Sequence, residues 1–456
     1  MSTKHSKAAA RFIGNRKQEA WHDETLWMVR VKRDKMSHSL PEWERLRELA
    51  CEIKLYSNSH LDVLLEEFEK NATANGAIVH WAKDAAEHNA IVEEILQQHK
   101  AHTLIKSKSM LTEECGMNDY LFGKGYDIIE SDLGERILQW MKLHPSHIVM
   151  PAIHIKRQEV GEMMERVLGT EKGNSDPTYL THAARQALRA KFLGADVSMT
   201  GVNFAVASTG ALAVCTNEGN ADLGTSFADL HIAIMGIEKV IPDMRALAVF
   251  TRLLARSGTG QPVTTYTSLY RRPAPGKRIH VILVDNGRSE WLADARHRNM
   301  LKCLRCGACM NTCPVYRRSG GYSYSYFIPG PLGINLSMLR SPELHRGNVS
   351  ACSLCYSCSE VCPAKIDLGE QIYMWRQQLD ALGLADRTKK LAVKGMDFVM
   401  NGTRRFYGGI ALARAAGKLP RFVVENGLNP WSAPGRAMPP FAPQTFNAWW
   451  KKGRGE

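Results

Sequence analysis

Between about residue 60 and residue 290, short apolar runs alternate with longer stretches in which apolar side chains recur every three or four positions. The short runs predict strands at Ala77–Trp81, Thr103–Lys106, Asp127–Glu130, His147–Pro151, Ala211–Thr216, Leu230–Met235, Val263–Leu269 and His280–Asp285. The amphipathic stretches predict helices at Asp84–His99, Gln158–Leu168, Pro177–Phe192 and Asp243–Arg256. Because strands that alternate with helices need crossover connections, this pattern predicts an α/β fold with a largely parallel sheet.

The regions on either side lack this alternation. The first sixty residues are charged and helical in pattern, and Pro41 ahead of Trp43 marks the start of a helix. A further amphipathic helix is expected over Asp367–Leu382, with an apolar stripe formed by Leu368, Ile372, Trp375 and Leu379. The chain is therefore expected to divide into a helical segment (1–60), an α/β domain (61–290), a cysteine-rich helical domain (291–385) and a basic C-terminal domain (386–456).

Eight of the eleven cysteines fall into two copies of the pattern Cys-x2-Cys-x2-Cys-x3-Cys-Pro. In this pattern four thiolates hold each cubane iron–sulfur cluster, and the fourth cysteine of each run ligates the other cluster. One [4Fe–4S] cluster is therefore assigned to Cys303, Cys306, Cys309 and Cys362, and a second to Cys352, Cys355, Cys358 and Cys313. A helix after each run indicates an α-helical ferredoxin module, and the pair of clusters indicates electron transfer.

Three other interpretations of these cysteines are structural zinc, a disulfide scaffold and clusters with a purely structural role. Structural zinc uses paired Cys-x2-Cys knuckles and needs no third cysteine at the same step. A disulfide scaffold is normally a short secreted chain in an oxidising compartment. Clusters with a purely structural role stay open, because spacing alone does not distinguish them from a relay. The remaining cysteines, Cys51, Cys115 and Cys215, are scattered and are interpreted as packing residues.

Glycine turns between Thr200 and Gly210, and the turn that contains Glu218 and Asn220, surround apolar segments of the α/β region. Ligands of α/β sheets bind where strands end in such loops, so Glu218 and Asn220 form a possible ligand site for a carboxylate or a phosphate. Tight turns without a ligand would leave the same pattern. No Gly-x-Gly-x-x-Gly opens a helix and no Walker loop occurs. The histidines show no orienting carboxylate in sequence, so no catalytic residue is assigned.

Charge and hydropathy change the picture mainly at the C-terminus. The formal net charge is +13, and the segment from Ala385 to Glu456 holds thirteen Lys and Arg against four Asp and Glu. A solvated face is the simplest interpretation, and docking to an acidic partner or an anionic membrane surface is the functional one. A proline-rich tail over Pro430–Pro443 leads to Trp449 and Trp450. Neither an apolar run long enough to span a membrane nor a secretory signal occurs, so a reduced cytoplasmic setting is expected.

Taken together, these features resemble the lactate utilisation protein B family. The resemblance covers nearly the full length and is carried by the two cysteine runs and the segments Ala74–Trp81, Thr200–Asn220, Ile232–Lys239 and Pro439–Phe446. Membership would imply an α/β lactate-utilisation domain of the sugar-phosphate isomerase and CoA-transferase type, a helical ferredoxin module and a short C-terminal domain. It would also imply a three-protein system that oxidises L-lactate to pyruvate, with a cysteine-rich subunit and a shorter lactate-utilisation-domain protein as partners.

Within such a system the chain is expected to be a non-catalytic electron-transfer subunit, with the substrate chemistry on a partner or at a shared interface. Removing hydrogen from a 2-hydroxy acid needs a base and an organic acceptor, and no such site is visible in the sequence. Two alternatives stay open: an iron–sulfur subunit of another 2-hydroxy-acid or glycerol-phosphate oxidation complex, and a ligand-binding α/β protein with structural clusters.

Overall fold

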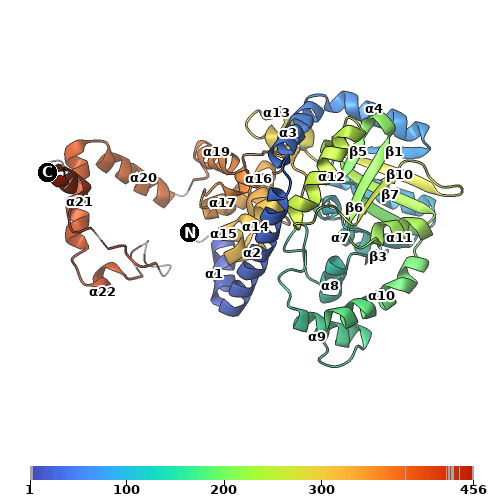
Figure 1. The fold of residues 1–456 in the computed structure, drawn as a ribbon, viewed down its shortest axis with the longest axis horizontal. Coiled ribbons are helices and arrows are strands. Elements are labelled where there is room, and N and C mark those ends of the chain that lie inside the picture. Colours follow the sequence, from blue (N-terminus) through green and yellow to red (C-terminus); the bar gives the residue numbers. More distant parts are fainter. Residues whose placement is uncertain are drawn as a thin grey trace. The chain divides into compact units, whose positions relative to one another are not determined.

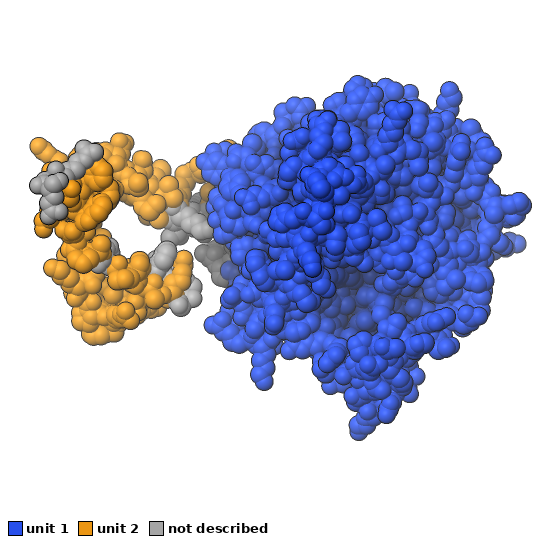
Figure 2. All heavy atoms as spheres, in the orientation of Figure 1, with its two compact units in different colours: residues 1–379 blue, residues 380–456 orange. Residues whose placement is uncertain are grey.

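The structure is a computed structural model that describes residues 4–385, 387–427, 429, 432, 436–440 and 442–453. The chain forms two compact units, Met1–Leu379 and Asp380–Glu456, which Figure 2 colours separately. Of the expected proline-rich tail, Pro430, Pro434 and Phe441 lie outside the described residues.

A six-stranded, fully parallel sheet forms the centre of the larger unit, in the order β1-β10-β7-β4-β2-β3. Its strands are β1 (Ala77–Ala82), β2 (Thr103–Lys106), β3 (Asp127–Glu130), β4 (Val197–Gly201), β7 (Leu230–Gly236) and β10 (Arg278–Val284). Every residue of β7 is buried, as expected for a central strand covered on both faces. The predicted α/β fold with a parallel sheet is therefore confirmed.

Side chains of β7 alternate between two hydrophobic cores. Ile232 and Ile234 pack in a cluster with α5 and α7, whereas Ala233 and Met235 pack in a cluster with α4 on the opposite face. This period of two is the pleat of a strand, and it fixes which helices cover which face. The helices of this domain are α4 (Leu61–Ala74), α5 (Ala85–Gln98), α6 (Met110–Glu114), α7 (Met117–Gly123), α8 (Leu133–Met141), α9 (Arg157–Leu168), α10 (Pro177–Leu193), α11 (Asn220–Phe227), α12 (Met244–Gly258) and α13 (Arg288–Ala293).

A second, four-stranded sheet in the order β8-β5-β6-β9 lies beside the first (Figure 1). Its strands and the two adjoining 3-10 turns are β5 (Phe204–Val206), η1 (Ala207–Thr209), β6 (Ala211–Thr216), η2 (Ile237–Lys239), β8 (Val240–Ile241) and β9 (Tyr266–Tyr270). The glycine-rich segment after Thr200 therefore contains strand β5 as well as turns. Its tight turn at Gly210 has a φ of +65°, which glycine adopts without strain.

The strand expected at His147–Pro151 is wrong, because these residues form turns. The ring Nδ1 of His147 accepts hydrogen bonds from the backbone N–H groups of Val149 and Met150, both at 3.0 Å. Its Nε2 lies 3.0 Å from Oδ1 of Asn311 in the cysteine-rich region. The imidazole thus satisfies backbone donors that a strand would have paired with a neighbour, and the segment curls instead of extending.

Short helices form the cysteine-rich region, and the N-terminal helices pack against it. The elements are α1 (Lys4–Gly14), α2 (Arg16–His38), α3 (Trp43–Ser59), η3 (Arg298–Lys302), α14 (Ala308–Thr312), α15 (Pro314–Ser319), η4 (Gly321–Ser323), α16 (Gly330–Arg340), α17 (Pro342–Ala351), α18 (Ser357–Glu360) and α19 (Leu368–Ala381). Helix α2 contacts α14 and α15 (Figure 1). Helix α3 starts at Trp43, and α19 buries the predicted stripe of Leu368, Ile372, Trp375 and Leu379.

The smaller unit contains the helices α20 (Arg387–Met400), α21 (Thr403–Ala416), α22 (Arg421–Val424) and α23 (Phe446–Gly453). Among its described residues, α21, α22 and α23 bury no side chain, and Phe446, Trp449 and Trp450 are exposed. No helix within the described ranges is both long enough and apolar enough to cross a membrane.

Candidate metal centre and the cavity beside it

The two cysteine runs fold into loops with the same backbone pattern. Residues two and four positions after the first cysteine are left-handed in both: Arg305 (φ 60°) and Gly307 (φ 78°) in the first loop, Leu354 (φ 53°) and Tyr356 (φ 60°) in the second. Left-handed residues other than glycine are uncommon. Their recurrence at matched positions shows that both runs curl around their cysteines in the same way.

Backbone N–H groups point at four of the thiols. The distances from N to Sγ are 3.4 Å for Arg305 to Cys303, 3.4 Å for Tyr316 to Cys313, 3.3 Å for Leu354 to Cys352 and 3.3 Å for Ile366 to Cys362. Such bonds stabilise negative charge on sulfur, which a thiolate ligand carries and an ordinary buried thiol does not. The loops therefore have the electrostatics of a thiolate cradle.

One set of thiols surrounds a small cavity. Cys303, Cys306, Cys309 and Cys362 all line it, and its other walls are mostly apolar, formed by Leu304, Gly307, Ala308, Leu332, Pro363, Ala364, Ile366 and Leu368. Within the described ranges, no three His, Cys, Asp or Glu side chains are placed to hold a single metal ion. Four thiols spread around a small, mostly apolar cavity suit an inorganic cluster, whose four irons each take one thiolate.

The second set gathers around Cys313. Burial raises the pKa of the Cys313 thiol to about 12, and the neighbouring thiols that raise it further are Cys352 and Cys355. Burial likewise raises the pKa of Cys306 to about 12, with Cys362 and Cys303 as the neighbouring thiols. The structure thus brings the cysteines together in the crossed grouping that their spacing suggests. Their role as ligands stays a prediction.

The insertion between the two runs buries tyrosines beside the second set. Tyr324 is buried, and the thiols of Cys313 and Cys352 contribute to raising its pKa, after the larger effect of burial. Tyr316 is fully buried and donates a hydrogen bond to the carbonyl oxygen of Ser146 at 2.6 Å. These rings keep water from that side of Cys313.

Two arginines near the first run are neutralised by helix α2. Arg317 pairs with Asp23 at 3.1 Å, and Arg318 pairs with Glu19 at 3.0 Å and with Asp23 at 3.1 Å. Paired charges exert a weaker field on a nearby site than free ones do. Arg305 is different, because its closest carboxylate oxygen, on Glu238, is 3.9 Å away.

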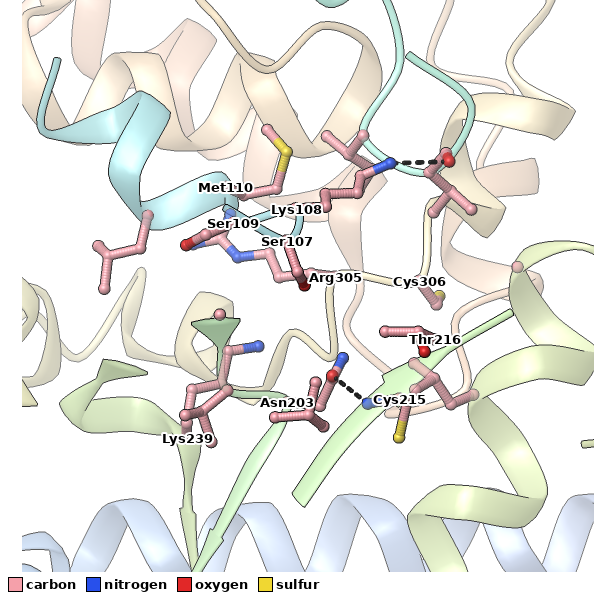
Figure 3. Close-up of a pocket in the computed structure, with 18 of the residues that line it drawn as sticks. Ser107, Lys108, Ser109, Met110, Asn203, Cys215, Thr216, Lys239, Arg305 and Cys306 are labelled. Atoms are coloured by element: carbon pink, nitrogen blue, oxygen red, sulfur yellow. Dashed lines mark hydrogen bonds between the residues drawn. The ribbon is translucent and has the colours of Figure 1, made fainter. Parts of the chain in front are cut away.

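A larger cavity of about 260 Å³ lies at the carboxyl edge of the parallel sheet. Its walls come from the segments that follow β2, β4 and β7, and from Arg305 and Cys306 of the first cysteine loop (Figure 3). Because parallel strands all end at the same edge, their loops converge there. Cys306 lines both cavities, so this one adjoins the first thiol set.

Cations dominate one side of the larger cavity. The ammonium of Lys239 points into it (Figure 3), and no hydrogen bond or ion pair to another described residue satisfies this group. Lys108 is occupied, because it pairs with Glu135 at 3.1 Å and donates to the carbonyl of Val149 at 2.8 Å. Lys239 was not predicted from the sequence. Its only signal there is a lysine three residues after a strand whose one polar residue is His231.

The structure places only one residue of the predicted pair, Glu218 and Asn220, in the cavity. Glu218 lines the cavity mouth, where withdrawal from water, followed by the charge of Asp132, raises its pKa. Asn220 is not among the lining residues. It is buried and donates to Oγ of Ser131 at 2.9 Å and to Oδ2 of Asp132 at 2.8 Å, so it orients Asp132.

A buried ion network, of which Glu114, Glu238 and Arg288 line this cavity, joins the two domains of the larger unit. Arg288 bonds Glu238 at 2.6 Å and Glu114 at 2.9 Å, and Arg340 of α16 also contacts Glu114. Burial alone would raise the pKa of Glu238, but the neighbouring cations, with Arg288 the largest, lower it to about 2. The network fixes Glu238, and through it the placement of Arg305.

Comparisons with known proteins identify a matching family for each of the two domains of the larger unit. Residues 65–290 match the LUD domain, and residues 299–366 match the 4Fe-4S dicluster domain. Lactate utilization protein B of Bacillus pumilus (strain SAFR-032) is 39% identical over 435 residues, which cover 91% of this chain and 90% of the relative.

A protein of Escherichia coli (strain K12) named "Uncharacterized electron transport protein YkgF" is 36% identical over 438 residues, 93% of this chain and 91% of its own. A crystal structure of a DUF162 family protein from Deinococcus radiodurans aligns with 49% of this chain and 98% of its own. Its TM-score is 0.25, at 14% sequence identity.

Proposed function

Because the chain belongs to the lactate utilization protein B family, we propose that it is the iron–sulfur electron-transfer subunit of a system that oxidises L-lactate to pyruvate. The observation that carries this proposal is the pair of matched cysteine loops, whose thiols gather into two neighbouring sets. The relatives' names supply lactate as the substrate and electron transport as the role.

In this proposal Cys303, Cys306, Cys309 and Cys362 hold one [4Fe–4S] cluster, and Cys352, Cys355, Cys358 and Cys313 hold the second. Each cluster supplies a site that accepts and releases one electron. The chain's own residues supply the thiolates, the backbone N–H donors that stabilise them, and the apolar walls that exclude water from the first set.

The closeness of the two thiol sets supports a relay of electrons from one cluster to the other, rather than two clusters that store electrons separately. Cys358 of the second set is among the thiols that raise the pKa of Cys309 in the first, after the larger effect of burial. Lactate oxidation releases two electrons, and two adjacent one-electron sites can pass them in sequence.

The N-terminal helices hold the far end of the cysteine module in place. Arg47 of α3 donates from Nε to the carbonyl oxygen of Cys362 at 3.0 Å and from Nη2 to that of Glu360 at 2.6 Å. Arg33 of α2 donates to the carbonyl oxygen of Val361 at 3.0 Å. The position of Cys362 beside the first run therefore depends on these two buried arginines.

We assign removal of hydrogen from lactate to a partner or a shared interface. The expected partners are a cysteine-rich lactate utilisation subunit and a shorter protein with the same lactate-utilisation domain. The basic smaller unit, with exposed Phe446, Trp449 and Trp450, is the part we assign to docking on an acidic partner or an anionic membrane surface. A ligand-binding role for the α/β domain is the second candidate, favoured by the cavity beside Cys306.

Anaerobic reconstitution tests the relay. The chain, loaded with iron and sulfide, is mixed with both partners, and the paramagnetic signals of reduced clusters are followed after L-lactate is added. We expect signals only with the full set and L-lactate. Reduction driven instead by glycolate or glycerol 3-phosphate would assign the chain to another oxidation system. If dithionite cannot reduce the clusters reversibly, their role is structural.

A further inference from the structure

We propose that the 260 Å³ cavity at the sheet edge binds a small 2-hydroxy or 2-oxo monocarboxylate, with its carboxylate at Lys239 and Arg305. The proposal deepens the proposed function and rests on it only for the natural occupant, L-lactate or pyruvate. The site lies on this chain, even though the chemistry is assigned to a partner.

Lys239 is the first anchor. It ends the turn η2 directly after the buried strand β7, so its backbone is fixed by the sheet. Its ammonium faces the cavity without a hydrogen-bond acceptor or ion-pair partner among the described residues (Figure 3). A half-buried charge without a partner is costly, and an anionic ligand would relieve that cost.

Arg305 is the second anchor, and it arrives from the cysteine module. Its Nη2 lies 3.9 Å from Oε1 of Glu238, whose other oxygen is bonded to Arg288 at 2.6 Å. The Nη1 of Arg305 is buried without a hydrogen-bond partner in the described part of the chain. A ligand carboxylate would supply the missing acceptor, and a planar guanidinium matches a carboxylate in geometry.

Asn203 supplies a neutral donor for the rest of the ligand. Its Oδ1 accepts a hydrogen bond from the backbone N–H of Cys215 at 2.8 Å, which fixes the amide so that Nδ2 faces the cavity (Figure 3). This Nδ2 group has no protein acceptor among the described residues and can donate to a hydroxyl or keto oxygen. A 2-substituted acid has such an oxygen beside its carboxylate.

The charge balance favours a monoanion over phosphate. Lys108 is already paired with Glu135, and Arg305 is partly neutralised by Glu238. Of these three cations, Lys239 is the one without an ion-pair partner among the described residues. Asp132 and Glu218 line the same cavity and would repel a dianion more strongly than a singly charged carboxylate.

The site also reaches the first thiol set. Cys306 lines both cavities, and the backbone N–H of Arg305 bonds Cys303 Sγ at 3.4 Å. An anion held at Arg305 disfavours the addition of an electron nearby, because like charges repel at short range. Occupancy of the cavity should therefore lower the reduction potential of the first cluster while leaving that of the second nearly unchanged.

Binding by the cluster-loaded chain, without partners, tests the proposal. Anaerobic calorimetry would use L-lactate, pyruvate, neutral lactamide and inorganic phosphate as probes, with Lys239→Met as the variant and Lys172→Met, at an exposed position, as the matched control. We expect both acids to bind the wild type and K172M, and to bind K239M about tenfold or more weakly. Redox titration with and without pyruvate should show a shift that K239M abolishes.

Equal binding of lactamide, equal affinity in K239M, or no acid binding by the wild type would overturn the site. Preferential phosphate binding would overturn the monocarboxylate assignment. Iron content and circular dichroism of K239M show whether the variant is folded, and Asn203→Ala gives a second variant that weakens the 2-substituted acids relative to acetate. Since no partner or turnover enters these measurements, their outcome is separate from that of the lactate-driven cluster reduction.

Discussion

Replacing Arg288 by methionine should destabilise the larger unit severely. Arg288 is 1% exposed, and its guanidinium is shared between Glu114 and Glu238, whose side chains are 4% and 5% exposed. It also donates to the carbonyl oxygen of Asp285 at 3.0 Å. Methionine matches much of the aliphatic volume but leaves two carboxylates buried without their shared cation.

The magnitude follows from that burial. Removing one partner of a buried ion pair costs about 3–5 kcal/mol, because the remaining charge stays desolvated. A domain of 150–250 residues, the range into which the LUD match at 65–290 falls, loses about 2–4 °C in Tm per kcal/mol. We therefore expect R288M to lower the Tm by at least about 6 °C.

The assay is thermal unfolding of the cluster-loaded chain by circular dichroism under anaerobic conditions at pH 7. Arg189→Met, at an exposed helical position, is the matched control and should change the stability by less than about 0.5 kcal/mol. Adding Glu114→Gln and Glu238→Gln to R288M should recover part of the loss, because neutral amides cost less to bury. A fall of less than 2 °C in R288M would refute the reasoning.

Two further outcomes follow from single buried positions. Burial lowers the pKa of His231 to about 3. Below pH 6.5 this histidine therefore binds a proton in the unfolded chain but stays neutral in the folded chain until the pH approaches 3. Stability should therefore be intact above pH 6.5 and fall toward pH 3, and His231→Gln should remove about 1.4 kcal/mol per pH unit of that slope, measured from Tm between pH 6 and 4. A Cβ at Gly210 would lie 2.4 Å from the backbone nitrogen of Ala72, whereas Gly169, also left-handed, has open space. Gly210→Ala should thus cost more than about 2 kcal/mol and Gly169→Ala about 1, by urea unfolding; equal losses would contradict the packing argument.

Features that local sequence determines were predictable. The spacing of the cysteines reports a loop geometry, and the apolar runs of β2 and β3 were bounded correctly because each lies between clear turn and helix signals. The strands β4, β5 and β8 were missed. Strand β4 mixes small polar residues with apolar ones although it is buried, and β5 and β8 have only two or three buried residues, which carry no readable period. The segment His147–Pro151 has a strand-like composition, but it turns because the imidazole of His147 accepts hydrogen bonds from two of its backbone N–H groups.

The cavity could not be predicted from local sequence patterns. Its cations come from positions 239 and 305, and only the parallel arrangement of strands and the docking of the cysteine loop bring them together. Glu218 was identified because it lies in a recognisable turn, whereas Asn220, two residues later, faces the protein interior. Sequence distance and spatial distance are unrelated across such a sheet edge.

The most direct test of the central claim is the iron and acid-labile sulfide content of two double variants, prepared anaerobically. Crossed ligation predicts that Cys303→Ala with Cys362→Ala strips one cluster only, leaving about four irons of the wild type's eight or so. It predicts that Cys303→Ala with Cys313→Ala damages both clusters and leaves almost none. The reverse result, with the first pair emptying the chain and the second keeping half, would contradict the account.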